Sequence, residues 1–158
     1  MSLKLRVDHT IPAPPEAVWT VLVDWVGQRR WIPLTTVRVV SDQTSGLGVR
    51  CEALSGWWLG RLPIGLLDRF IVTAWQPPKG NEPGLLEVLH LGPYFTGPGV
   101  FELRPTPQGT EVHCTEIVDV AGGRVTTWPA GLLVPIMRTG FRRSLRALGR
   151  LSVQTQVR

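Results

Sequence analysis

The chain has 158 residues, of which 43% are hydrophobic and 18% charged, and its formal charge is +5. This length is typical of one domain, which buries about 70% of its unfolded surface and needs no disulfide or metal to fold. The composition excludes a disordered or fibrous chain. No apolar run reaches the ~18 residues of a membrane span, and no signal-peptide pattern opens the chain. We therefore expect one domain over residues 1–158, located in the cytoplasm.

The N-terminal third predicts a strand followed by two short helices. Residues 3–11 alternate apolar and polar side chains, the period of a half-buried strand. Pro15 suits the first turn of a helix, and Glu16 is favourable beside its N-terminal dipole. Gly27 interrupts this helix, and a second short helical turn is expected to end before Pro33.

Six further strands are predicted, each bounded by turn residues. They cover residues 35–41, 49–54, 66–76, 85–91, 100–104 and 110–120. No helical pattern separates them, and parallel crossovers normally need one. The strands should therefore form a mostly antiparallel sheet in consecutive order.

The connection over residues 54–67 is unusually apolar for a link between strands. It contains Trp57, Trp58, Leu59, Leu62 and Ile64, which would form a large apolar patch if all were solvated. Three interpretations remain open: a flap over a cavity, a dimer contact, or strands longer than drawn above.

The C-terminal segment predicts an amphipathic helix over about 136–152, because Pro135 should break its early part. Its apolar arc comprises Val134, Met137, Phe141, Leu145, Leu148 and Leu151.

Residues 120–158 hold seven arginines and no acid, whereas the other 119 residues hold ten basic and twelve acidic groups. The basicity therefore belongs to this segment. A solvated arginine face is the plain interpretation, and a transient contact of Arg138, Arg142 and Arg146 with an anionic membrane is the alternative. The tryptophans fall mainly outside the basic segment, which counts against nucleic-acid binding.

Several segments together resemble a known family. They are Ile11-Pro-Ala-Pro-Pro-Glu-Ala-Val-Trp19, Trp31-Ile-Pro33, Gly48, Trp75-Gln-Pro-Pro78, Leu103-Arg-Pro-Thr-Pro-Gln-Gly-Thr110 and the final helix. In this order they resemble the START-like (SRPBCC) superfamily, in its polyketide cyclase/dehydrase and lipid-transport branch. The resemblance implies an α+β helix-grip (START/Bet v 1-like) fold, in which a curved seven-stranded antiparallel sheet surrounds a long C-terminal helix. It also implies a cavity for lipids, polyketides or other apolar molecules, and a minority of members are cyclases, aromatases or dehydratases.

The standard catalytic signatures are missing, so an enzyme would have to use acid–base groups placed in the cavity. The candidates are His9 and His90, which lie in apolar strand registers, Glu116, and Tyr94 in a Gly/Pro-rich loop. Cys51 and Cys114 have no metal-ligand spacing and are interpreted as core residues. We expect no metal and no cofactor.

The expected function is binding, transport or sensing of a small hydrophobic molecule, and a cyclase or dehydratase is the alternative. The expected ligand-binding residues are Trp31, Trp57, Trp58, Tyr94, Phe95, Phe101, Val134, Met137, Phe141 and Leu145. The identity of the ligand and the choice between monomer and homodimer stay open at this point.

Overall fold

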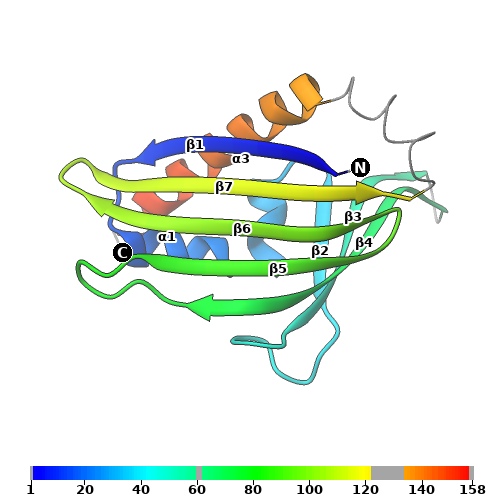
Figure 1. The fold of residues 1–158 in the computed structure, drawn as a ribbon, viewed down its shortest axis with the longest axis horizontal. Helices are drawn as coiled ribbons and strands as arrows, with labels where there is room; N and C mark the ends of the chain where they lie inside the picture. Colours follow the sequence, from blue (N-terminus) through cyan, green and yellow to red (C-terminus); the bar gives the residue numbers. More distant parts are fainter. Residues whose placement is uncertain (1, 60–61, 122–133, 157–158) are drawn as a thin grey trace.

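A computed structural model describes residues 2–59, 62–121 and 134–156, with the backbone alone at 57–59 and 62–63. Seven strands form one antiparallel sheet in the order β1-β7-β6-β5-β4-β3-β2 (Figure 1). Their bounds are β1 (Leu3–Ile11), β2 (Thr35–Val39), β3 (Arg50–Leu59), β4 (Leu62–Gln76), β5 (Gly84–Pro93), β6 (Phe95–Thr106) and β7 (Gly109–Val120). The predicted seven-stranded antiparallel sheet is confirmed.

Two short helical segments follow β1, and one long helix ends the chain. The first is the α-helix α1 (Pro15–Leu22), and the second is a 3-10 helix, η1 (Val26–Arg30). The long helix α3 (Val134–Thr155) exceeds the predicted 136–152 at both ends. Pro135 does not break it because it lies in the first turn, where its missing N–H has no intrahelical partner.

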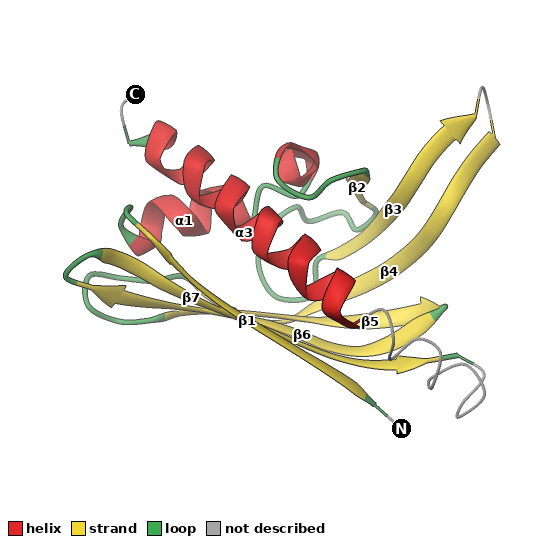
Figure 2. Cartoon of the chain, turned by 90° about the horizontal axis from the view of Figure 1, so that it is seen from above, coloured by secondary structure: helices red, strands yellow, loops and turns green. Residues whose placement is uncertain are grey.

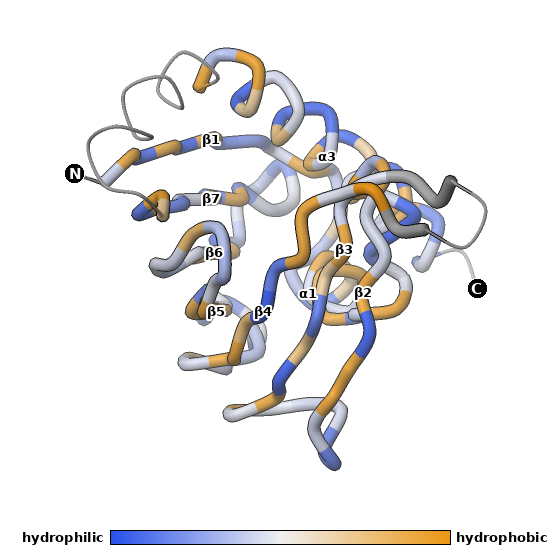
Figure 3. The backbone as a smooth tube through the Cα atoms, turned by 90° about the vertical axis from the view of Figure 1, so that its right-hand side faces the viewer, coloured by the Kyte–Doolittle hydropathy of each residue, from blue (hydrophilic) through white to orange (hydrophobic). Residues whose placement is uncertain are grey.

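The sheet curves around the helices (Figure 3), and α3 crosses its concave face (Figure 2). The inward side chains of alternating strand positions, such as Val7, Val72 and Val112, form one core with Leu145 and Leu148 of α3. This arrangement is α+β and consistent with a helix-grip fold. Both cysteines are buried and unpaired, which fits the core interpretation.

The apolar segment 54–67 is a two-stranded arm and not a loop. Pairing of β4 with β5 begins only at Asp68, and pairing of β3 with β2 stops at Ser55. Beyond these points, residues 56–59 and 62–67 have no strand partner outside the β3–β4 pair, and we call them the β3–β4 arm. The arm projects away from the rest of the sheet (Figure 2). The interpretation that the strands are longer than drawn is therefore confirmed.

No helix in the described part of the chain combines the length and the hydropathy needed to cross a bilayer.

Candidate functional site

A cavity of about 430 Å³ lies between the inner face of the sheet, the segment after α1, and the first half of α3. Its walls are mostly aromatic and aliphatic, with Phe70 and Phe101 from the sheet and Phe141 and Leu145 from α3. A cavity of this size and character is typical of sites for small molecules.

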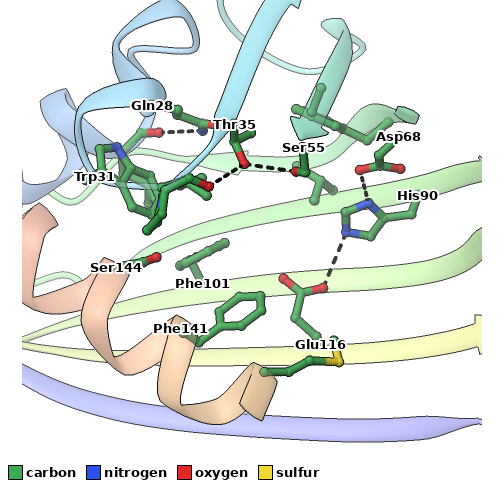
Figure 4. A pocket seen from close by; sticks show the side chains of 18 of the residues that line it. Gln28, Trp31, Thr35, Ser55, Asp68, His90, Phe101, Glu116, Phe141 and Ser144 are labelled. Atoms are coloured by element: carbon green, nitrogen blue, oxygen red, sulfur yellow. Dashed lines mark hydrogen bonds and ion pairs between the residues drawn. The ribbon is translucent and has the colours of Figure 1, made fainter. Parts of the chain in front are cut away.

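One chain of polar side chains crosses the sheet wall of this cavity. His90 on β5 lies between Asp68 on β4 and Glu116 on β7 (Figure 4). The His90 Nδ1 atom donates to Asp68 Oδ2 at 2.7 Å, and its Nε2 atom lies 3.3 Å from Glu116 Oε2. The three side chains are largely buried, with relative solvent exposures of 10–13%. An acidic group therefore faces each nitrogen of a largely buried imidazole.

Strand alternation brings these three groups to one face. Asp68 shares the inward face of β4 with Phe70, His90 shares that of β5 with Val88, and all four line the cavity. The apolar positions of these strands thus predict the direction of the polar ones.

Glycine in β6 allows Glu116 to reach His90, although β6 separates β5 from β7. Gly99 is the register partner of both Val88 and Glu116. A Cβ atom at position 99 would lie 2.6 Å from Glu116 Oε2, closer than real Cβ contacts. The carboxylate therefore occupies the space that any other residue at this position would fill.

The two acidic neighbours determine the protonation of His90. Burial by itself lowers the pKa of the imidazole, but contact with the Asp68 and Glu116 carboxyl groups outweighs it and raises the pKa to about 9. The ring consequently carries a positive charge at neutral pH. Phe70 and Phe95 pack against it, with ring centroids 6.1 and 5.2 Å from that of His90.

Other polar groups in the cavity wall are few. The Thr35 and Ser55 hydroxyls bond each other at 2.9 Å, and Gln28 Nε2 donates to the Leu22 carbonyl. Ser144 is a buried hydroxyl of α3 that lines the cavity. Within the described residues, Trp31 Nε1, Asp68 Oδ1 and His90 Nε2 are buried without a hydrogen-bond partner, which costs about 1–3 kcal/mol each for an unpaired group. The contact of His90 Nε2 with Glu116 is an ion pair.

The structure brings most of the predicted residues to this cavity. Those that line it are Trp31, Phe95, Phe101, Met137, Phe141, Leu145, His90 and Glu116. Two of the candidate acid–base groups, His90 and Glu116, approach each other across β6.

Two predicted residues lie away from the cavity wall, and two others have side chains that are not described. Tyr94 is 49% exposed at the β5–β6 turn and does not line the cavity. Val134 packs against the core without reaching the cavity wall, because it lies in the first turn of α3. The side chains of Trp57 and Trp58 lie outside the described residues.

His9 differs most from its prediction. It faces inward from β1 as expected, but β1 is an edge strand, so His9 lies in a separate open groove beside Arg146 and Arg150 of α3. Burial and the Arg146 charge lower its pKa. His9 and Glu116 are therefore not parts of one site.

Sequence reasoning missed Asp68 and Ser144. Asp68 lies beside Arg69 near the start of the predicted strand 66–76, where a surface pair of the two is the simplest interpretation, but β4 begins at Leu62. Arg69 pairs instead with Glu52, and Asp68 points to His90. The alternation with Phe70 was the available signal. Ser144 lies between Phe141 and Leu145 on the helix face that lines the cavity, and its position in this arc was the corresponding signal.

Among the described residues, no group of three or more His, Cys, Asp or Glu side chains is arranged to hold a metal ion. The arginines of α3, including Arg138, Arg142 and Arg146, are exposed. Within the same described ranges, none of these three forms an ion pair with an acid.

No protein-family model matches the chain, and no curated protein matches it in sequence. Solved structures do match its fold. The TTHA0849 protein of Thermus thermophilus aligns with a TM-score of 0.72 and 19% identity, covering 97% of this chain and 99% of that one. The SA2116 protein of Staphylococcus aureus, described as a protein of unknown function, aligns with a TM-score of 0.70 and 10% identity over 100% and 98% of the two chains. CV1439 of Chromobacterium violaceum has a TM-score of 0.64 and 16% identity, covering 94% and 96%. These similarities extend over the whole chain and concern the fold.

Proposed function

We propose that this protein binds a small, largely apolar molecule in the cavity between its sheet and α3, as a carrier or sensor. The observation that carries the proposal is the 430 Å³ cavity itself, with its aromatic and aliphatic walls. Filling such a volume with protein side chains would stabilise the fold. A retained cavity with a few polar groups in its wall is the arrangement expected of a ligand site. The resemblance to START-like ligand-binding proteins supports the same function.

Native mass spectrometry of freshly purified protein tests this proposal. We expect a small molecule to copurify with the wild type and with Thr139→Phe, which alters an exposed position of α3. Ser144→Phe should lose it, because the new ring extends from the buried face into the cavity (Figure 4). If the wild type carries no small molecule and also fails to take up the neutral dye N-phenyl-1-naphthylamine, the proposal is wrong.

The Asp68–His90–Glu116 chain favours a second candidate function, acid–base catalysis of the cyclase or dehydratase type. A protonated imidazole inside an apolar cavity can donate a proton to a substrate oxygen, and a neighbouring carboxylate can accept one from carbon. Perturbed histidines of this kind are concentrated at catalytic sites.

Deuterium exchange at the α-carbon of 2-tetralone in D₂O, followed by proton NMR, separates this candidate from simple binding. Catalysis predicts exchange faster than in buffer, and slower exchange in His90→Gln and Glu116→Gln. The control is His113→Gln, which alters an imidazole that contacts Asp8 away from the cavity. Equal exchange rates in buffer, wild type and all variants would leave binding as the function.

A further inference from the structure

The cavity wall holds two acidic groups, Asp68 and Glu116, and the unpaired oxygen of Asp68 is buried. The Glu116 carboxylate is therefore the acidic group that can face a ligand. Its Oε2 atom faces the His90 ring at 3.3 Å. Figure 4 shows the other carboxyl oxygen turned toward Phe101, on the side away from His90. The side chain is only 10% exposed, and within the described residues it contacts no second basic group. One oxygen is therefore in ion-pair contact with His90, while the other faces the apolar interior.

The charges around His90 leave an excess of negative charge at this wall. One protonated imidazole lies between two acidic side chains, so the positive charge is shared and does not neutralise both. The arginines of α3 do not compensate, because those at 138, 142, 143, 146 and 150 are exposed and none lines the cavity. An anionic group entering the cavity would meet a like charge in largely apolar surroundings, where the repulsion is stronger than in water.

Ser144 adds a hydroxyl on the opposite wall. It projects from α3 toward Phe101 (Figure 4) and is 7% exposed. A hydroxyl can donate or accept a hydrogen bond, so Ser144 can pair with either a donor or an acceptor at the polar end of a ligand. The carboxylate of Glu116 can only accept hydrogen bonds. A ligand that pairs with it must therefore donate one.

We propose that the cavity selects apolar ligands whose polar end donates a hydrogen bond, either a neutral hydroxyl or a protonated amine, to Glu116, and that it rejects carboxylates such as fatty acids. This inference rests on the proposed binding function and specifies its ligand class. Glu116 is the recognition residue. His90 and Asp68 are positioning residues, which hold one carboxyl oxygen so that the other faces the ligand.

Three ligands with the same apolar body test this selectivity: 2-naphthol, 2-naphthylmethylamine and 2-naphthoate, titrated calorimetrically into the full chain at pH 7. The naphthol or the amine should bind roughly tenfold or more tightly than the naphthoate, because a like charge opposes the naphthoate. The naphthol and amine arms distinguish the two kinds of donor. Tighter binding of the amine would identify charge as the main determinant, and equal binding would identify hydrogen bonding.

Glu116→Gln should bring the ratio of affinities toward one, because an amide is uncharged and can also donate. Glu102→Gln changes an exposed carboxylate that pairs with Arg104 and should keep the ratio. Naphthoate binding as tightly as naphthol to the wild type overturns the inference while leaving the binding function intact. This comparison needs no variant and remains decisive if Glu116→Gln does not fold. If none of the three ligands nor N-phenyl-1-naphthylamine binds, the proposed function itself is wrong.

Discussion

His90 links the chemistry of the cavity to the stability of the fold. Its pKa of about 9 lies above the ordinary value of 6.5 because the contacts with Asp68 and Glu116 outweigh burial. A group whose pKa is raised by folding stabilises the protein fully below its unfolded pKa, and this contribution is lost as the pH rises through the folded pKa.

The free energy of unfolding should therefore fall between pH 6.5 and 9.5, by up to ~3 kcal/mol for a shift of this size. Urea unfolding of the wild type and of His90→Gln across this range measures the effect. His113→Gln is the control, because this imidazole contacts Asp8 away from the cavity, and it should retain the fall. Parallel pH profiles for the wild type and His90→Gln would contradict the prediction.

Gly99 is the residue on which the contact between His90 and Glu116 depends. Gly99→Ala would place a methyl group 2.6–3.0 Å from the Glu116 carboxyl group, and the flexible end of that side chain should move aside. The pKa of His90 should then fall toward its ordinary value, because one acidic neighbour is withdrawn. NMR titration of the His90 ring measures this shift. Gly140→Ala, which adds the same methyl group with no atom within 4 Å, should leave the pKa of His90 at its wild-type value.

At the scale of single elements, α3 contains two glycines that differ in their surroundings. Gly140 has open space where a Cβ would lie, whereas a Cβ at Gly149 would lie 3.3 Å from Ile11 Cγ1 in the core. Alanine in a helix interior is favoured over glycine by about 1 kcal/mol. Gly140→Ala should therefore raise the free energy of unfolding by roughly that amount.

Gly149→Ala should gain less or lose stability, because Ile11 is fully buried and has little room to move. Thermal unfolding of the two variants side by side measures the difference. A larger gain for Gly149→Ala than for Gly140→Ala would contradict the packing described for α3 against β1.

The strands were largely predictable because their apolar periods are local. Residues 3–11 and 110–120 alternate along their whole length, and the structure pairs them in that register. The β3–β4 arm was not predictable in the same way, because its run of Trp57, Trp58 and Leu59 does not alternate. In the sequence alone, its tryptophans are equally typical of a flap over a cavity or of a contact surface, so the strand pairing could not be inferred from them.

The site was only partly predictable, for a reason that lies in strand order. His90 and Glu116 each follow an apolar register, so their inward direction could be inferred. Their approach to each other depends on β6 lying between them with glycine at position 99, which requires the sheet order. Asp68 was missed because the adjacent Arg69 suggests a surface ion pair, although the alternation of Asp68 with Phe70 indicates the inward face.

At the scale of the whole molecule, the β3–β4 arm should be less stable than the sheet from which it projects. Isolated two-stranded hairpins are marginally stable in water, and the arm has no further strand on either side. Its exposed residues include Ile64 and Leu66.

Hydrogen exchange should show this difference directly. We expect the backbone amides of the arm to exchange faster than those of β6 and β7, which have strands on both sides. Mass spectrometry of peptides from the two regions measures the rates. Equal protection in the arm and in β6 would mean that a second copy or another surface covers the arm, as the dimer interpretation requires.

The pairing of β1 with β7 also has a consequence for biosynthesis. The partner of Leu3 is Val118, and that of Ile11 is Thr110, so β1 leaves the ribosome well before the strand with which it pairs. At about 5–20 residues per second, this interval lasts on the order of 5–25 s. During it, the apolar side of β1 has neither its neighbouring strand nor the helix that covers it. Nascent chains of this protein should therefore stay sensitive to protease, and accessible to chaperones, until translation has passed α3.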